Sequence, residues 1–187
     1  MELGKTLYVT NRKQWRSWLV KNHKKEKEIW LIYYRKSSGK KRIPYNDAVE
    51  EALCYGWIDG IVKGIDEKTF AQRFTPRRSN SMLSQTNKER IHRLIEEKKM
   101  TVKGLNAVKH VFDESSKNSK CIIKDDILRL LKEEKTTWEN FQKFPESYKR
   151  IRIGWIEGAR TRPELFKKRL EYFLKMTAKN KRYGMVQ

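Results

Sequence analysis

Runs of β-branched and aromatic residues in the first part of the chain predict strands. Residues 7–10 (LYVT) and 28–36 (EIWLIYYRK) are two such runs, and the second has the composition of a buried strand. Residues 57–66 and 68–78 form two more, and the short polar connection between them predicts a hairpin. Pro76 should end the last of these strands, because proline has no amide hydrogen to donate to a neighbouring strand.

Elsewhere apolar residues recur at i, i+3 and i+4, the spacing that places them on one face of an α-helix. The first such helix contains Trp15, Trp18 and Leu19, and Thr10 or Asn11 can cap it. A second helix follows Pro44, contains Val49, Ala52 and Leu53, and ends near Gly56. A third contains Ile91, Leu94 and Ile95 after a capping box of Thr86 and Glu89. The remaining predicted helices contain Leu105, Val108 and Phe112; Ile127, Leu130 and Leu131; Tyr148, Ile151, Trp155, Ile156 and Ala159; and, after Pro163, Phe166, Leu170, Phe173 and Leu174.

Together these elements predict an α+β fold, in which a small antiparallel or mixed sheet is flanked by helices and followed by a helical C-terminal unit. The polar segment 113–120 is the best linker candidate. We therefore predict an α+β domain over residues 1–112, which carries the WIDG and RFTPRR motifs, and a helical region over residues 121–187.

The composition limits the class of protein. Of the 187 residues, 37% are hydrophobic and 11% aromatic, which is enough for a core and argues against a disordered polyelectrolyte. No apolar stretch is long enough to span a membrane, and the first residues lack the apolar region of a signal peptide, so we expect a cytoplasmic protein. The two cysteines and three scattered histidines have the spacing of neither a disulfide framework nor a metal site.

The net charge of +21 is the most unusual feature of the composition, and such a field attracts polyanions. The excess is greatest toward both ends of the chain and forms no uninterrupted basic block. Because lysines outnumber arginines, a solvated lysine-rich surface is favoured as the explanation of the charge over a dedicated nucleic-acid surface. Because most aromatic residues stand at core spacing, we expect any binding to DNA to be weak, non-specific and strongly salt-dependent.

One cluster of residues has the chemistry of an anion-binding site. Strand alternation places Trp57 and Asp59 on one side of the first hairpin strand, and Arg73 and Thr75 on one side of the second. We expect these side chains and Arg77 to line one edge of the sheet, where guanidinium groups bind phosphate or carboxylate and an indole stacks on a ligand. The full set of predicted ligand-binding residues is Trp57, Asp59, Arg73, Thr75, Arg77, Arg78, Ser81 and Asn87.

Alternatives remain open at these positions. Asp59 could instead pair with Arg73 across the hairpin while Trp57 packs in the core, a purely structural arrangement. Cys54, close by, suggests a nucleophile, but a thiol near a helix C-terminus is expected to be structural because the helix dipole raises its pKa. We find no motif of a known enzyme class and expect neither a cofactor nor a metal.

The segments ALCYGWIDG, RFTPRR, MTVKGLNAV and, near the C-terminus, F-x-x-F-P-E-S-Y-K-R followed by GWIEGAR resemble the YdeI/OmpD-associated (bacteriocin-protection) family. The chain departs from the family where Leu83 replaces a tryptophan and where Leu165 and Phe166 follow Glu164 in place of a Thr-Arg pair. The resemblance implies a cytoplasmic α+β protein linked to bacteriocin or envelope stress, without an assigned catalytic residue.

Three functions therefore compete. The leading hypothesis is a protein that binds a small anionic ligand, in a cleft between the hairpin and the helical unit, with Trp57 stacking and Arg73 and Arg77 holding the anion. The first alternative is a non-specific nucleic-acid-binding protein. The second is a hydrolase or transferase that uses Cys54 or Asp59.

Overall fold

The computed structural model describes residues 3–113 and 119–184, and the contacts of the chain divide it into two compact units. Unit 1 comprises Met1–Met82 and Arg90–Phe112, and unit 2 comprises Leu83–Glu89 and Asp113–Gln187. The elements up to the end of unit 1 are β1 (Thr6–Tyr8), α1 (Arg12–Asn22), β2 (Ile29–Tyr34), the 3-10 helix η1 (Lys36–Ser38), α2 (Tyr45–Cys54), β3 (Trp57–Gly64), β4 (Thr69–Pro76), α3 (Gln85–Glu96) and α4 (Val102–Val108). Helix α3 contributes Gln85–Glu89 to unit 2 and Arg90–Glu96 to unit 1.

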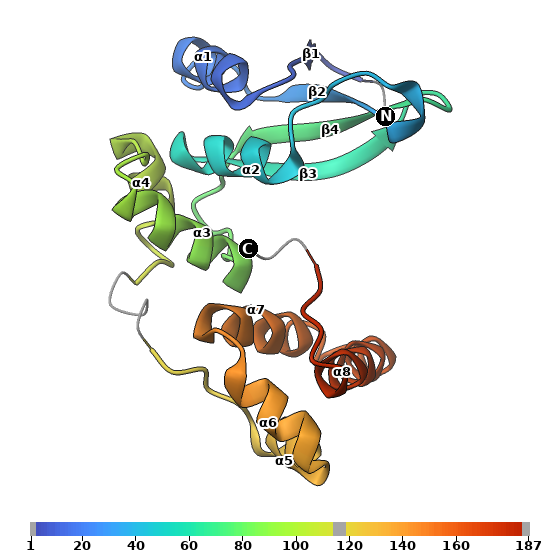
Figure 1. Cartoon of the computed structure of the whole chain (residues 1–187). Helices are drawn as coiled ribbons and strands as arrows, with labels where there is room; N and C mark the ends of the chain where they lie inside the picture. Colours follow the sequence, from blue (N-terminus) through green and yellow to red (C-terminus); the bar gives the residue numbers. More distant parts are fainter. Residues whose placement is uncertain (1–2, 114–118, 185–187) are drawn as a thin grey trace. The chain divides into compact units, whose positions relative to one another are not determined.

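The four strands form one mixed sheet in the order β1-β2-β4-β3 (Figure 1). Strand β1 is parallel to β2, whereas β4 is antiparallel to both β2 and β3. The β3–β4 pair is the hairpin expected from the sequence, and Pro76 is the last residue of β4, as predicted. The predicted α+β class with a helical C-terminal region is confirmed.

The core of unit 1 lies where helices α1 and α2 pack on one face of the sheet. Trp15 of α1 is fully buried, donates its indole N–H to the Ala48 carbonyl at 3.0 Å and contacts the ring of Phe74 edge-on. Asn11 caps α1, because its side-chain oxygen accepts a hydrogen bond from the Gln14 amide at 3.0 Å. The predicted stripe of α1 therefore faces the core.

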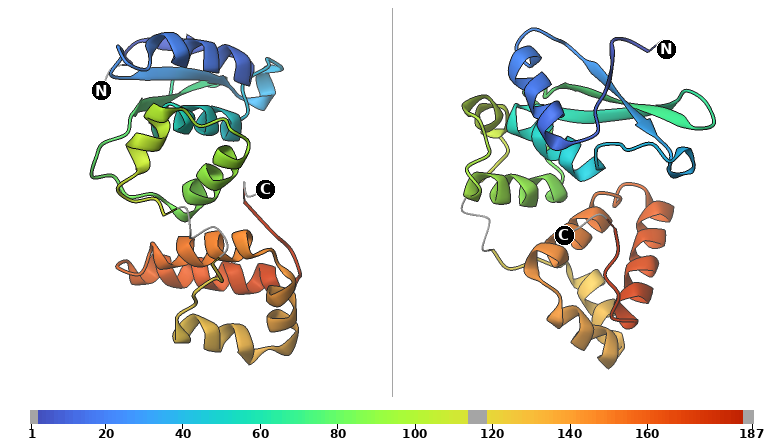
Figure 2. Two further views of the ribbon diagram at one scale, coloured as in Figure 1. Left: turned by 90° about the vertical axis from the view of Figure 1, so that its left-hand side faces the viewer. Right: turned by 45° about the horizontal axis from the view of Figure 1, so that its top comes forward.

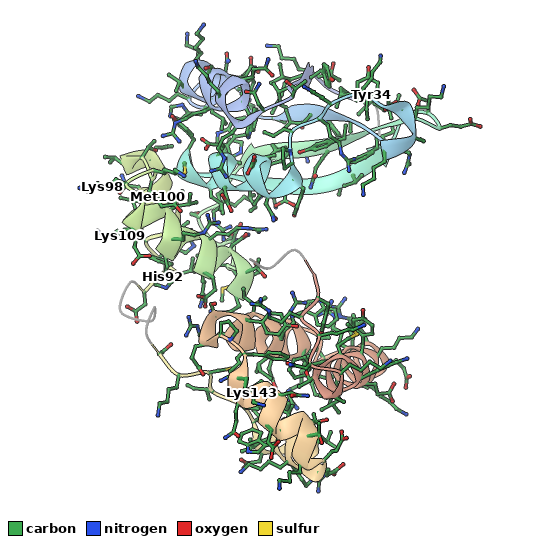
Figure 3. All side chains as sticks on the ribbon, in the orientation of Figure 1. Tyr34, His92, Lys98, Met100, Lys109 and Lys143 are labelled. Atoms are coloured by element: carbon green, nitrogen blue, oxygen red, sulfur yellow. The ribbon has the colours of Figure 1, made fainter. Side chains whose placement is uncertain are left out.

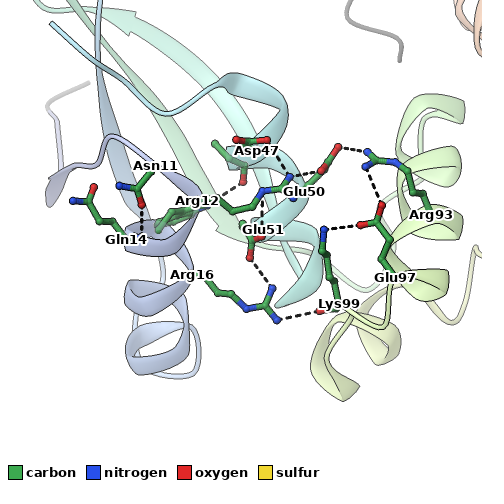
Figure 4. Close-up of polar contacts among 12 residues, drawn as sticks. Asn11, Arg12, Gln14, Arg16, Asp47, Glu50, Glu51, Arg93, Glu97 and Lys99 are labelled. Carbon is green, nitrogen blue, oxygen red and sulfur yellow. Dashed lines mark hydrogen bonds and ion pairs between the residues drawn. The ribbon is translucent and has the colours of Figure 1, made fainter.

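A buried ionic network also joins α1 and α2 to α3 (Figure 4). Glu50 and Glu51 of α2 are 3% and 1% exposed, and their carboxylates accept hydrogen bonds from arginines of the neighbouring helices. Glu50 is paired with Arg12 and Arg93, and Glu51 with Arg16 at 2.8 Å. Buried carboxylates need such partners, because an unpaired charge in the interior is very costly.

Unit 2 contains α5 (Asp125–Glu133), α6 (Lys135–Lys143), α7 (Glu146–Glu157) and α8 (Pro163–Ala178), which group together in both views of Figure 2. Pro163 stands in the first turn of α8, as predicted. Helix α6 has no counterpart among the predicted helices. The core of unit 2 is formed by Ile127, Leu131, Phe141, Phe144, Tyr148, Ile153, Ile156, Leu170 and Phe173.

Two local predictions need comment. The prediction of a capping box formed by Thr86 and Glu89 is wrong, because α3 begins one residue before Thr86. The Ser84 hydroxyl instead accepts a hydrogen bond from the Asn87 amide at 3.3 Å. The predicted linker 113–120 includes residues 114–118, which lie outside the described residues. Among the described helices, none combines the length and apolar composition that crossing a membrane requires.

Candidate functional site

A pocket of about 590 Å³ opens in unit 1 beside the beginning of β3 and the end of β4. Its walls come from the turn after α1, the α2–β3 junction, β4 and the first turn of α4. We call it the basic pocket, and it is lined by His23, Lys24, Lys25, Glu26, Lys27, Tyr55, Gly56, Trp57, Arg73, Thr75, Pro76, Arg78 and Lys103.

The turn that follows α1 supplies one wall of the basic pocket. The indole N–H of Trp57 donates to the His23 carbonyl at 3.2 Å, which ties this turn to the start of β3. The amides of Lys25 and Glu26 both bond the Asn22 carbonyl at 2.9 Å, so the chain makes a tight turn after the helix. The run of lysines that ends the apolar stripe of α1 therefore becomes a wall of the pocket.

The opposite wall depends on a close approach between the end of α2 and the start of α4. Gly56 has φ +74°, and a Cβ there would lie 3.1 Å from the Lys103 carbonyl oxygen. A Cβ on Gly104 would lie 2.3 Å from the Cys54 carbonyl oxygen, which is too close for any side chain. Thr101 caps α4 and donates its hydroxyl to that same carbonyl at 2.6 Å. These contacts place Lys103 at the pocket.

The lining is strongly cationic. Among the described residues, the side chains of five exposed cations in it form neither an ion pair nor a cation–π contact: Lys24, Lys25, Lys27, Arg78 and Lys103. Arg73 is different, because its Nε donates to Glu28 at 2.7 Å. Glu26 is the acidic residue of the lining, and it pairs with Lys5. The unpaired charges repel one another, and a bound anion would relieve that repulsion.

Comparisons with known proteins assign this part of the chain. Residues 7–107, more than half of the chain, match a family model described as a domain of unknown function (DUF8412). The chain belongs to this family. Residues 120–180 match the model described as bacteriocin-protection, YdeI or OmpD-associated, which confirms the resemblance for the C-terminal region. No curated protein and no solved structure matches the chain. The basic pocket is therefore a feature of the DUF8412 region.

Four of the predicted ligand-binding residues line the basic pocket: Trp57, Arg73, Thr75 and Arg78. Trp57 nevertheless has a role other than the predicted one. It is 1% exposed, and its ring meets Trp18 edge-on with centroids 5.7 Å apart. Since both its N–H and its ring are engaged within the protein, Trp57 is a core residue that closes the pocket wall. The prediction of an exposed stacking surface at this position is wrong.

Asp59 lies on the other face of the sheet from Arg73 and Thr75. The register pairs Asp59 with Phe74, and neighbouring residues of a strand point to opposite faces. The Asp59 carboxylate accepts hydrogen bonds from the Tyr45 hydroxyl at 2.8 Å and the Gln72 amide at 3.0 Å. Both the expectation that Asp59 lines the same edge as the arginines and the alternative Asp59–Arg73 pair are therefore wrong.

Arg77, Ser81 and Asn87 are not among the residues that line the basic pocket. Arg77 holds the turn after β4, because its Nη2 donates to the carbonyls of Ser81 at 2.7 Å and Met82 at 2.8 Å. Burial lowers the pKa of this guanidinium. Asn87 lies in the first turn of α3, in the segment grouped with unit 2, so its contribution to a site with the other residues stays a prediction.

The residues that sequence reasoning missed are the lysines at 24, 25, 27 and 103. In the sequence the first three only interrupt an apolar stripe, and Lys103 lies on an exposed helix face. The hydrogen bond from Trp57 to the His23 carbonyl brings the turn that contains the first three lysines to the start of β3. A strand residue that reaches back to an earlier helix end cannot be read from local spacing.

The thiol of Cys54 is fully buried. Burial, and next the charge of Glu51, raise the pKa of Cys54 to about 12, so the thiol is protonated at neutral pH. The burial and the raised pKa favour a structural role for Cys54, as the sequence predicted. They argue against the hydrolase or transferase alternative that uses this thiol.

Proposed function

We propose that the DUF8412 region binds a small phosphate-bearing ligand in the basic pocket. The observation that carries the proposal is the set of five cations in its lining whose charged groups have no partner among the described residues. Elsewhere in unit 1, Arg12 and Arg16 of α1 are matched by the buried carboxylates of Glu50 and Glu51. An excess of unpaired charge around one hollow is what an anion site requires.

The lining also suggests how the ligand is held. Arg73 is oriented by Glu28, which fixes its guanidinium beside Thr75, whose hydroxyl can donate to a phosphate oxygen. Arg78 offers a bidentate fork, and Lys103 a point charge from the opposite wall. Charge-assisted hydrogen bonds of this kind contribute about 1.5–3 kcal/mol each.

The wider role is proposed from the C-terminal region. Its match to a bacteriocin-protection family supports a link to bacteriocin or envelope stress, with ligand binding in residues 1–112 and a separate role for residues 121–187. We also propose a cytoplasmic location, in line with the expectation from the sequence.

Isothermal titration with pyrophosphate tests the site directly. The variants Arg78→Gln and Lys103→Gln each remove one unpaired charge from the pocket, and we expect each to weaken binding about tenfold. The matched control is Lys109→Gln, which removes the same charge from an exposed position of unit 1 outside the pocket (Figure 3).

The control should change the dissociation constant by less than about twofold. Equal weakening in all three variants would mean that pyrophosphate responds only to net charge, and the pocket would lose its role. Absence of saturable binding to the unmodified protein would reject the proposal outright.

A further inference from the structure

A second pocket of about 500 Å³ lies between β1 and α1, also within unit 1. We call it the α1 pocket, and it is lined by Leu7, Tyr8, Val9, Lys13, Gln14, Ser17, Trp18, Lys21 and Asn22. It is less charged than the basic pocket, because its lining contains the aromatic rings of Tyr8 and Trp18 but only two charged groups, Lys13 and Lys21. Those two lysines, both exposed, make no ion pair within the described part of the chain.

Trp18 contributes a fixed, partly exposed aromatic ring to the α1 pocket. Its ring stacks on the fully buried Trp15 with centroids 5.2 Å apart and an interplanar angle of 18°. That packing fixes the ring, and Trp18 is only half-buried, so part of the indole reaches the pocket. A rigid, partly exposed indole is suited to contact a flat aromatic ring.

The two pockets are neighbours. Trp18 of the α1 pocket meets Trp57 of the basic pocket edge-on at 5.7 Å. The chain passes from one lining to the other between Asn22 and His23. Lysines at positions 21, 24, 25 and 27 follow this passage, so positive charge continues from the aromatic pocket to the basic one.

We propose that the ligand joins a phosphate to an aromatic ring, as a nucleotide does, and that the ring occupies the α1 pocket while the phosphate occupies the basic pocket. This inference rests on the proposed function, because it assigns the phosphate to the same site. The alternation of an aromatic surface with cations is the arrangement by which proteins bind nucleotides without reading their sequence. A free nucleotide and a nucleotide within a single strand share this chemistry, and the experiment separates them.

The test compares pyrophosphate, adenosine diphosphate and a short oligothymidine by isothermal titration. Ser17 is exposed on α1 and lines the α1 pocket, so Ser17→Trp should fill the pocket without disturbing the core. Val20 is 57% exposed on the same helix and lines neither pocket, which makes Val20→Trp the matched control. As a second variant, Trp18→Phe keeps the packing on Trp15 but reduces the ring surface.

We expect adenosine diphosphate to bind the unmodified protein about tenfold more tightly than pyrophosphate. Ser17→Trp should remove that advantage, Trp18→Phe should reduce it, and pyrophosphate binding should stay within about twofold in both. Tighter binding of the oligothymidine than of adenosine diphosphate would identify a single strand as the source of the nucleotide, whereas the reverse order would identify the free nucleotide.

Equal affinity of the unmodified protein for adenosine diphosphate and pyrophosphate would overturn the inference and leave the anion site intact. The inference is also overturned if Val20→Trp weakens the binding of adenosine diphosphate as much as Ser17→Trp does. Failure of pyrophosphate itself to bind would instead reject the proposed function, so the two failures are distinguishable.

Discussion

Replacement of Glu51 by Gln tests whether the buried carboxylates of α2 hold unit 1 together. Glu51 is 1% exposed, and Arg16 of α1 bonds it at 2.8 Å while Arg12 approaches it at 3.4 Å (Figure 4). Glutamine keeps the shape of the side chain but removes its charge. Burial by itself lowers the pKa of Arg16, but its interactions with neighbouring groups, that with Glu51 first, raise the pKa overall.

The size of the effect follows from the burial of one partner. Removing one member of a buried ion pair costs about 3–5 kcal/mol, because the other charge keeps its desolvation penalty. The side chains of Arg12 and Arg16 are 28% and 36% exposed, so water compensates them in part. We therefore expect the lower end of that range, a loss of about 3 kcal/mol in the free energy of unfolding.

Urea denaturation followed by tryptophan fluorescence measures this loss, because four of the six tryptophans lie in unit 1: Trp15, Trp18, Trp30 and Trp57. The matched control is Glu97→Gln, the same change in a carboxylate whose side chain is 34% exposed and pairs with Lys99 at 2.7 Å. Because exposed pairs contribute little, this control should lose less than about 1 kcal/mol. Equal losses in the two variants would refute the view that burial makes the Glu51 pair important.

Two further predictions concern the junction between α2 and α4. Gly104→Ala should destabilise unit 1 by about 1–3 kcal/mol, because its Cβ would lie 2.3 Å from a backbone oxygen; Gly64→Ala, with no atom within 4 Å, is the control in thermal unfolding. Burial and then Glu51 raise the pKa of Cys54 from 9.0 to about 12, so the folded state keeps its proton where the unfolded state loses it. The free energy of unfolding should therefore fall as the pH rises from 9 toward 12, and it should fall less steeply in Cys54→Ala. Iodoacetamide should label this thiol only after unfolding. Rapid labelling of the folded protein at neutral pH would contradict both expectations.

Much of the fold could be predicted from local patterns. The stripe of Trp15 and Leu19 identified α1, and the β-branched runs identified β2 and the hairpin, because burial on one face imposes a period on the sequence. Helix α6 was missed because only Glu134 separates it from α5, so no loop in the sequence marks where it begins. The capping box failed because two serine or threonine hydroxyls stood near the start of α3, and only the backbone shows which one accepts the bond.

The candidate site could be predicted only in part, since its two halves depend on different kinds of information. Arg73 and Thr75 share a face because strands alternate, which the sequence states directly. The face that Asp59 takes depends on its register with Phe74, and that register is a pairing across the hairpin. The lysines after α1 depend on a contact over more than 30 residues, the bond from Trp57 to the His23 carbonyl. From the sequence alone, a run of lysines can be a solvated surface or part of a pocket. Here the position of the run depends on Trp57, the most buried residue of the predicted site, which bonds the backbone of the turn that contains the lysines. In the site that we propose, Trp57 positions the lysines after α1 and does not contact the ligand with its ring.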